Sequence, residues 1–358
     1  MKLLKYIQLG HGSGGKLTHE LINEMFVKHF DNEILRQQGD SALLPMDALS
    51  LSSFTSESDV ARSFPADSKK LAFTTDAYVV DPVFFPGGNI GTLAVSGTVN
   101  DLAVTGAVPL YISAAFILEE GLAFQDLDEI VRTMAETARN AGVSIVTGDT
   151  KVVNRGQCDK IFITTTGVGV LESTFEHIAS GKRVETGDKI IVNGFVGDHG
   201  ISILGERESL NFTSPVRSDV SCLNSLIREV TRSFDVHFMR DATRGGVATV
   251  LAELAETRNK GIEIHETSVP VRDEVKGICE IFGYDPLYIA NEGKVVMVVA
   301  NEQAEEVLVR LRGHALGRES AIIGVVTGEP AGKVVLNTEI GGQRFLDMLA
   351  GEQLPRIC

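Results

Sequence analysis

The stretch IGTLAVSGTVNDLAVTGA, from Ile90 to Ala107, has helical length and unusually small side chains. Side chains this small allow another element to pack very close to a helix. Asn100 and Asp101 lie inside the apolar run, and burying an unpaired polar group costs roughly 1 to 3 kcal/mol. We therefore expect a closely packed helix at 90–107 whose Asn and Asp have partners.

The segments on either side of this helix predict an α/β fold. A strand at 71–74 precedes it. A βαββ unit follows it, with a strand at 110–118, a helix at 127–141, a buried strand at 143–151 and a strand at 160–170. A second alternating pattern runs from IIVNG at 190–194 to a strand at 322–326. Because 358 residues exceed the usual size of one hydrophobic core, we expect two domains.

We place the domain boundaries where the composition changes. They give an N-terminal glycine loop and helix at 1–36, a first α/β domain at 37–172, a second at 173–345 and a flexible tail at 346–358. The loop GHGSGGK at 10–16 fits neither the Walker nor the dinucleotide fingerprint, so an ordinary N-terminus remains an open alternative. The serine-rich segment 45–70 predicts a long exposed loop.

The tail ends on a thiol, Cys358. It contains Pro355 and no helical periodicity from 351 onward, which predicts a mobile segment rather than a packed element. Its last eight residues could reach about 25 Å when extended. The sulfur could then enter an active site or meet a partner, although the chain could also end at a cysteine by chance.

Composition limits the possible partners. Asp and Glu outnumber Lys and Arg by 48 to 33, and the resulting charge of −15 repels nucleic acids and anionic lipids. Without a signal peptide or a membrane-spanning stretch, we expect a cytoplasmic protein. The internal cysteines form no CxxC pair, which indicates neither zinc nor disulfides. We expect all three to be buried: Cys158, Cys222 and Cys279.

Five aspartates occupy similar positions at the ends of predicted strands or loops: Asp40, Asp76, Asp101, Asp149 and Asp241. Each alone could be a helix cap or an Asx turn. Gathered at one cleft they would repel each other unless cations held them, which favours a Mg²⁺-nucleotide site. Lys151 and Arg244 would then face phosphate, with the amides of Gly245 and Gly246 beside them. Surface salt bridges are the alternative for the two cations.

Nine motifs carry a family resemblance across essentially the whole chain: HGSGGK, GDSALL, TTDA, GGNIG, VNDLAVTGA, TGDTKVV, MRDATRGG, ANEGK and PRIC. Together they resemble the HypE family of hydrogenase maturation proteins. The internal motifs are similar to the wider PurM-like group, which includes aminoimidazole ribonucleotide synthetase, selenophosphate synthetase and thiamine monophosphate kinase. The terminal PRIC distinguishes HypE within that group.

The resemblance implies a two-domain PurM-like α/β fold. The N-terminal domain would form a barrel with its copy in a homodimer, and the layered C-terminal domain would cover ATP. The implied reaction is ATP-dependent dehydration of a carbamoyl group on Cys358 to a thiocyanate, whose cyano group goes to iron in nickel-iron hydrogenase assembly. The implied partners are HypF as carbamoyl donor and a HypC–HypD complex as cyanide acceptor, with no nucleic acid and no membrane.

The resemblance also assigns roles to residues of this sequence. Glu292 becomes the candidate base, although it could instead hold Lys294. There are two alternative functions. The protein could be another ATP-dependent PurM-like synthetase or kinase, or a noncatalytic nucleotide-binding scaffold. The implied metal ligands are Asp40, Asp76, Asp101 and Asp149. The implied ATP-binding residues are Gly12, Gly14, Gly15, Lys16, Asn100, Asp241, Arg244, Gly245 and Gly246, and the catalytic residues are Cys358, Lys151 and Glu292.

Overall fold

The helix α3 (Ile90–Val104) forms the centre of the first domain, as its sequence predicts. The computed structural model describes residues 15–23, 36, 41–45, 69–207, 215–349, 351, 354 and 356–358. Neighbouring elements approach α3 closely, because a Cβ atom on Gly91 would lie 2.4 Å from the carbonyl oxygen of Ile130. A Cβ atom on Gly97 would lie 2.4 Å from the hydroxyl oxygen of Tyr78.

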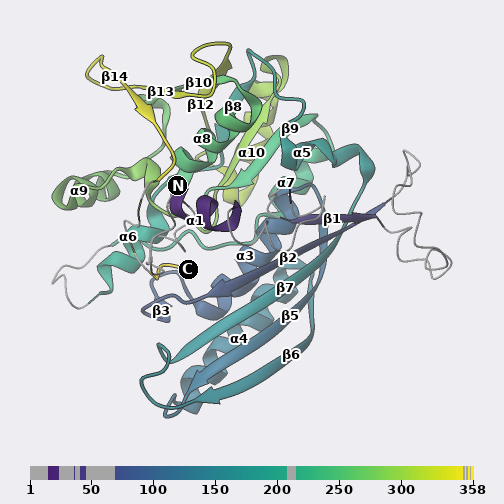
Figure 1. Cartoon of the computed structure of the whole chain (residues 1–358), viewed down its shortest axis with the longest axis vertical. Coiled ribbons are helices and arrows are strands. Elements are labelled where there is room, and N and C mark those ends of the chain that lie inside the picture. The colour runs from purple at the N-terminus through teal and green to yellow at the C-terminus, as the bar shows by residue number, and fades with distance from the viewer. Residues whose placement is uncertain are drawn as a thin grey trace.

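A five-stranded sheet packs against α3 and α4, which lie together on one of its faces (Figure 1). Its strand order is β1-β2-β7-β5-β6, and the β5–β6 pair is the parallel one. The elements are β1 (Ala42–Pro45), β2 (Lys70–Tyr78), β5 (Val108–Glu119), α4 (Phe124–Ala141), β6 (Ser144–Val153) and β7 (Ile161–Leu171). The predicted βαββ unit is confirmed.

Two predictions about these strands need correction. The strand β2 continues to Tyr78, so Asp76 lies within it rather than after it. The strand β6 was expected to be buried, but its residues from Ser144 to Val152 are exposed. The reason is its position at the edge of the sheet, where it pairs with β5 alone among the described strands. An apolar run in the sequence does not reveal whether another element covers it.

A seven-stranded sheet forms the second domain, in the order β14-β13-β10-β12-β8-β11-β9. The two short C-terminal strands β13 and β14 were not predicted. The strands are β8 (Lys189–Val192), β9 (Val236–Asp241), β10 (Gly261–His265), β11 (Val295–Val299), β12 (Ala321–Thr327), β13 (Val334–Asn337) and β14 (Gln343–Leu346). The helices are α6 (Asp198–Gly205), α7 (Asn224–Thr231), α8 (Gly246–Arg258), α9 (Asp273–Phe282) and α10 (Ala304–Gly313).

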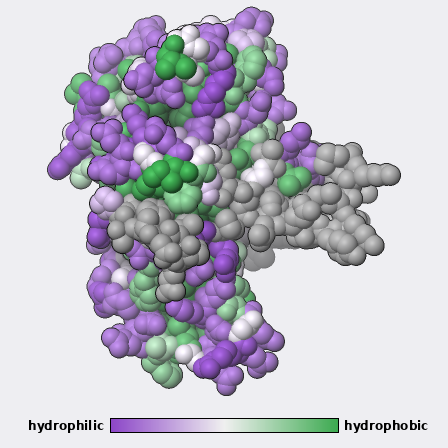
Figure 2. Space-filling view, turned by 90° about the vertical axis from the view of Figure 1, so that its left-hand side faces the viewer, coloured by the Kyte–Doolittle hydropathy of each residue, from purple (hydrophilic) through white to green (hydrophobic). Residues whose placement is uncertain are grey.

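Short elements complete the described chain: α1 (Lys16–Leu21), β3 (Phe84–Phe85), β4 (Gly88–Asn89) and α5 (His177–Ser180). Most of the serine-rich 45–70 segment lies outside the described residues. No described helix has the length and apolar character needed to cross a bilayer. The face shown in Figure 2 mixes hydrophilic and hydrophobic residues over both domains.

The end of the C-terminal tail is packed, which corrects the expectation of an unpacked segment. Leu354, Ile357 and Cys358 are buried, and the chain ends between α6 and β3 (Figure 1). The predicted tail begins one residue early, since Leu346 belongs to β14, but its described residues from 347 onward form neither helix nor strand, as predicted. The surfaces that bury them come from distant parts of the chain, so local periodicity could not reveal the docking.

Candidate functional site

A cavity of about 480 Å³ lies between the two domains. The first domain contributes residues of β2 and α3, and the second contributes the turn from β9 to α8 together with Glu292. The sulfur-bearing residue Cys358 also lines this cavity. The structure therefore gathers Asp76, Asp101, Asp241, Arg244, Glu292 and Cys358, which are six of the predicted site residues.

Two carboxyl groups meet on the side of the first domain. Asp76 and Asp101 share a hydrogen bond, and burial raises the pKa of Asp76. The hydroxyl of Thr74 donates to Oδ2 of Asp101 at 2.6 Å, and the hydroxyl of Tyr78 donates to Oδ2 of Asp76 at 3.1 Å. Two carboxyl groups in contact need either a shared proton or a cation between them.

The chemistry of this pair fits Mg²⁺. Proteins usually hold this ion through one or two carboxylates, while waters and substrate phosphates supply its other ligands. Asp76 and Asp101 would be those carboxylates. Within the described residues, no group of three or more His, Cys, Asp or Glu forms a metal cluster. The predicted ligand Asp40 lies outside the described residues.

Glu292 presents an unsatisfied carboxyl group to the cavity. It is 3% exposed, and its Oε1 has no hydrogen-bond partner among the described residues. Burial raises the pKa of Glu292 well above its usual range, and the nearby charge of Asp241 adds to that shift. Such an environment favours the neutral, protonated carboxyl. Glu292 can therefore act as a base only when a bound substrate or a rise in pH favours the ionised carboxylate.

Asp219 fixes the loop that carries Glu292. Its carboxylate accepts hydrogen bonds from the backbone N–H groups of Glu292 and Gly293, both at 3.1 Å. The ammonium group of Lys294 lies 2.8 Å from the same carboxylate. Lys294 is therefore held by Asp219, which removes the alternative role considered for Glu292. Sequence reasoning missed Asp219, because nothing near it in the chain marks its contact with residues 292–294.

Arg244 contacts the terminal cysteine directly. Its Nε donates to Sγ of Cys358 at 2.7 Å, and its Nη2 donates to a main-chain carboxylate oxygen of Cys358 at 2.9 Å. Burial raises the pKa of the Cys358 thiol to about 12, although the Arg244 guanidinium opposes this shift. Arg244 was expected to face phosphate, but in this structure it faces the sulfur.

The internal cysteines differ from one another. Cys279 is buried, as expected, whereas Cys158 and Cys222 are half-buried. Burial raises the pKa of Cys222 to about 11. All four cysteines are free thiols, and the sequence predicted no disulfide framework.

Asn100 lies behind the cavity rather than in it. Its Nδ2 donates to the carbonyl oxygens of Ser221 at 3.0 Å and Glu292 at 3.3 Å, and its Oδ1 accepts from the N–H of Leu223 at 2.7 Å. The partner expected for this polar residue of α3 therefore exists. Its side chain joins α3 to the loop of Glu292, a positioning role rather than the nucleotide contact that was expected.

Asp149 and Lys151 do not reach the cavity of their own chain. They form an exposed ion pair at 2.7 Å on β6. In the parallel register they lie opposite Ala115 and Ile117, two residues of β5 that share a face with Tyr111. The buried residues of β5, such as Ala114, point to the other face, toward α3. The pair thus lies on the sheet face turned away from α3.

The predicted glycines shape backbone turns. Gly245 and Gly246 have φ values of 79° and 60° at the start of α8, a conformation that favours glycine. A Cβ atom on Gly15 would lie 2.0 Å from the carbonyl oxygen of Leu349, which also accepts from the N–H of Lys16 at 2.9 Å. Gly12 and Gly14 lie outside the described residues.

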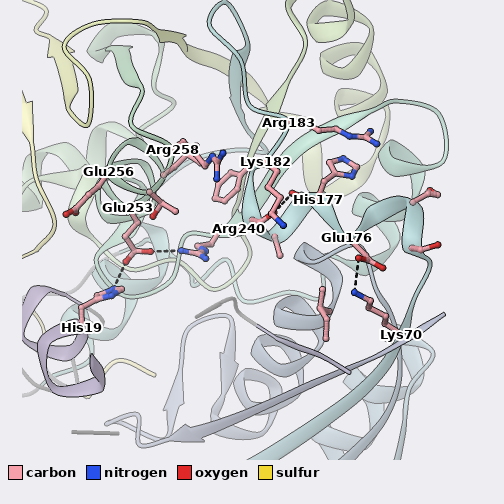
Figure 3. A pocket seen from close by; sticks show the side chains of 18 of the residues that line it. His19, Lys70, Glu176, His177, Lys182, Arg183, Arg240, Glu253, Glu256 and Arg258 are labelled. Carbon is pink, nitrogen blue, oxygen red and sulfur yellow. Dashed lines mark hydrogen bonds and ion pairs between the residues drawn. The ribbon is translucent and has the colours of Figure 1, made fainter. Parts of the chain in front are cut away.

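A second cavity of about 960 Å³ adjoins the first, because both are lined by His19, Arg240 and Glu253. Figure 3 shows His19 and Arg240 both directed at the carboxylate of Glu253. The distance from His19 Nε2 to Glu253 Oε1 is 2.8 Å. Sequence reasoning missed this chain of contacts, which joins α1 to α8 and β9.

Comparison with known proteins identifies the family of this chain. The profile of the AIR synthase related protein, N-terminal domain, matches residues 57–171, and that of the C-terminal domain matches residues 185–337. The chain is 46% identical to carbamoyl dehydratase HypE of Cupriavidus necator, covering 98% of this chain and 95% of the relative. It is 47% identical to the Escherichia coli HypE, covering 98% and 99%.

Solved structures show the same relationship. A HypE in complex with ATP has a TM-score of 0.75 at 45% identity, covering 97% of this chain and 98% of that one. The HypE of a HypE–HypF complex has a TM-score of 0.79 at 43% identity, covering 92% and 99%. A thiamine monophosphate kinase, AaThiL, shares the fold at 18% identity and a TM-score of 0.65, covering 97% and 99%. The chain therefore belongs to the HypE family of carbamoyl dehydratases, within the AIR synthase related proteins.

Proposed function

We propose that this protein uses ATP to dehydrate a carbamoyl group carried on Sγ of Cys358. One observation carries the proposal: the sulfur lies buried in the same cavity as Glu292, whose Oε1 has no hydrogen-bond partner among the described residues, and the carboxyl pair of Asp76 and Asp101. This arrangement supports a carrier atom, a base and a metal-phosphate site that act together in one cavity.

The chemistry requires activation of the carbamoyl oxygen. Transfer of the γ-phosphoryl group of ATP to that oxygen releases ADP and turns a poor leaving group into phosphate. Loss of phosphate and of the two N–H protons then leaves S–C≡N on the sulfur. The net reaction converts S-carbamoyl-cysteine and ATP into S-cyano-cysteine, ADP and phosphate.

The residues of the cavity suit these steps. Glu292 would accept the N–H protons, because it lines the cavity and its Oε1 has no hydrogen-bond partner in the part of the chain that the structure describes. Arg244 would hold the sulfur and orient the carbamoyl group attached to it. Mg²⁺ bound by Asp76 and Asp101 would neutralise charge on the phosphates of ATP. The adjoining cavity would hold the rest of the nucleotide beside Arg240.

The thiol is loaded elsewhere. Because the pKa of Cys358 is raised to about 12 in the cavity, the buried thiol stays protonated and is a poor nucleophile there. The tail must therefore leave the cavity to receive its carbamoyl group. A relative of this chain forms a complex with HypF. We propose a cytoplasmic carbamoyl donor of the HypF class and a HypC–HypD complex as the cyanide acceptor for hydrogenase iron.

We also propose that the protein works as a homodimer that completes the site. The edge strand β6 is exposed, and the sheet face turned away from α3 displays Phe73 and Tyr111, both opposite Val168 in register. A second copy packed on this face would bury them. It would also allow Asp149 and Lys151 of one copy to act in the cavity of the other, since they do not reach their own.

Mass spectrometry of the intact protein tests the reaction. After carbamoyl loading, addition of Mg²⁺ and ATP should remove the mass of one water from the wild type. Glu292→Gln should load and bind ATP without losing water, and Cys358→Ala should not load. A water loss in Cys358→Ala would contradict the proposal.

The alternative functions give different results. A noncatalytic scaffold would bind ATP without any mass change on Cys358. A kinase or synthetase of free substrates would turn over ATP with such a substrate after removal of residues 351–358.

A further inference from the structure

The C-terminal tail is held by contacts from both domains. On the side of the first domain, the Arg356 guanidinium lies 2.6 Å from the carboxylate of Asp159 and 3.4 Å from that of Asp81. The N–H of Asp81 donates to the Arg356 carbonyl oxygen at 3.0 Å. These side chains are half exposed, so the ion pairs contribute little to affinity on their own.

The contact on the side of the second domain is buried. His199, near the start of α6, is fully buried, and its Nε2 lies 2.6 Å from the carbonyl oxygen of Ile357. A carbonyl only accepts hydrogen bonds, so Nε2 carries the proton. The neutral ring then accepts at Nδ1 from the hydroxyl of Ser218, at 2.8 Å. Both ring nitrogens are satisfied while the tail is docked.

The ring of His199 is itself held in place. It meets the ring of Phe85 edge to face, with 5.5 Å between the centroids and an interplanar angle of 88°. Ser218, which sets the tautomer, is fixed in turn because its N–H donates to the carbonyl oxygen of Pro86 at 2.7 Å. The donor that meets Ile357 is therefore preorganised, one residue before the reacting sulfur.

We propose that His199 is a positioning residue that holds the carrier tail docked and places the Cys358 sulfur beside Arg244 and Glu292. The role of the docked state in catalysis rests on the proposed function. Undocking exchanges the hydrogen bond from Nε2 of His199 to Ile357 for one to water, so the net gain from this one hydrogen bond favours the docked state. Losing it shifts the tail toward the exposed state in which the thiol is loaded.

Alkylation of Cys358 in the full-length free protein measures docking directly. His199→Phe keeps a ring against Phe85 and removes the donor to Ile357. Because one buried hydrogen bond is worth about 1 to 1.5 kcal/mol, iodoacetamide should modify Cys358 about tenfold faster in this variant. His199→Gln, which can still donate to the carbonyl, should restore most of the protection. Peptide mass spectrometry separates Cys358 from Cys158, whose rate should not change.

Two further measurements separate positioning from general loosening. In single-turnover assays, His199→Phe should slow dehydration of the loaded sulfur, by at most about tenfold, while loading is unchanged or faster. Damage to the fold would slow both steps. His237→Phe removes another hydrogen-bonded histidine, one that pairs with Asp188 at 2.7 Å, and should leave Cys358 protected.

The inference and the proposed function can fail separately. An alkylation rate of Cys358 in His199→Phe within twofold of wild type would overturn the inference, as would an equal acceleration at Cys158. If alkylation changes as expected but the loaded wild type never loses water, docking by His199 stands and the proposed reaction falls.

Discussion

At the scale of single residues, Glu292 is the least compensated group of the site. Around it, Asp219 accepts hydrogen bonds from the N–H of Gly293 and the ammonium group of Lys294. The Oε1 of Glu292 itself lacks a hydrogen-bond partner among the described residues. A buried, unsatisfied carboxyl destabilises a fold, and such costs are concentrated at functional sites. The same feature that makes Glu292 a suitable base should therefore weaken the native state.

This cost predicts a pH-dependent stability difference. Burial raises the pKa of native Glu292, so as pH rises the unfolded chain loses this proton first and the wild type loses stability. Glu292→Gln removes the effect. The free energy of unfolding of Glu292→Gln, relative to wild type, should rise by about 1.4 kcal/mol per pH unit above about pH 5. The rise should stop where the pH reaches the raised pKa of native Glu292.

Urea denaturation at pH 6 and pH 8 measures this difference. Glu280→Gln, on the exposed side of α9, is the control and should show a difference from wild type that does not change with pH. A pH-independent difference for Glu292→Gln would contradict the prediction.

At the scale of elements, α3 acts as the spacer between the first sheet and the second domain. Its glycines set how closely α4 and β2 approach, and its Asn100 joins the helix to the Glu292 loop. Packing and catalysis are therefore connected through one helix. An increase in side-chain volume on α3 should disturb the interior more than the same change on a surface helix.

Gly91→Ala tests this packing. The added methyl would meet the Ile130 carbonyl oxygen and the Met134 side chain, so we expect a loss of about 1 to 3 kcal/mol in the free energy of unfolding. Gly277→Ala on α9 is the matched control, since nothing lies within 4 Å of its Cβ position. That change should stabilise the protein by about 0.5 to 1 kcal/mol. Equal effects of the two changes in urea denaturation would disprove the packing argument.

At the scale of the whole molecule, the structure divides the predicted site residues into two groups. Asp76, Asp101 and Glu292 meet in one cavity, whereas Asp149 and Lys151 lie on an exposed strand of the same chain. A dimer that shares its sites would explain both placements, because each copy would supply what the cavity of the other lacks.

Mixed dimers test this arrangement. Lys151→Met and Glu292→Gln should each abolish dehydration as pure dimers. After equal mixing and exchange, a site with intact Glu292 can receive Lys151 from the other copy, so about a quarter of all chains should be dehydrated. Those chains should carry Lys151→Met, which their mass reveals. If Lys151 acts within its own chain, mixing restores nothing.

Much of this arrangement could be predicted from local sequence. The small residues and polar pair of 90–107 identified α3, and the set of recurring aspartates included the Asp76–Asp101 pair, although both lie within their elements rather than at the ends. The rest depends on distant contacts. Arg244 faces the sulfur only because the tail docks, and β6 is exposed only because of its place in the sheet.

The docked tail has a consequence for the two domains. It contacts Asp81 and Asp159 on one domain and His199 and Arg244 on the other, so it acts as a strap across the cleft. Thermodynamic linkage then runs in both directions. Any ligand that fixes the two domains in this arrangement strengthens the docking of the tail by some factor. Docking of the tail strengthens the binding of that ligand by the same factor. Loading the sulfur, which requires the strap to open, should therefore compete with nucleotide binding.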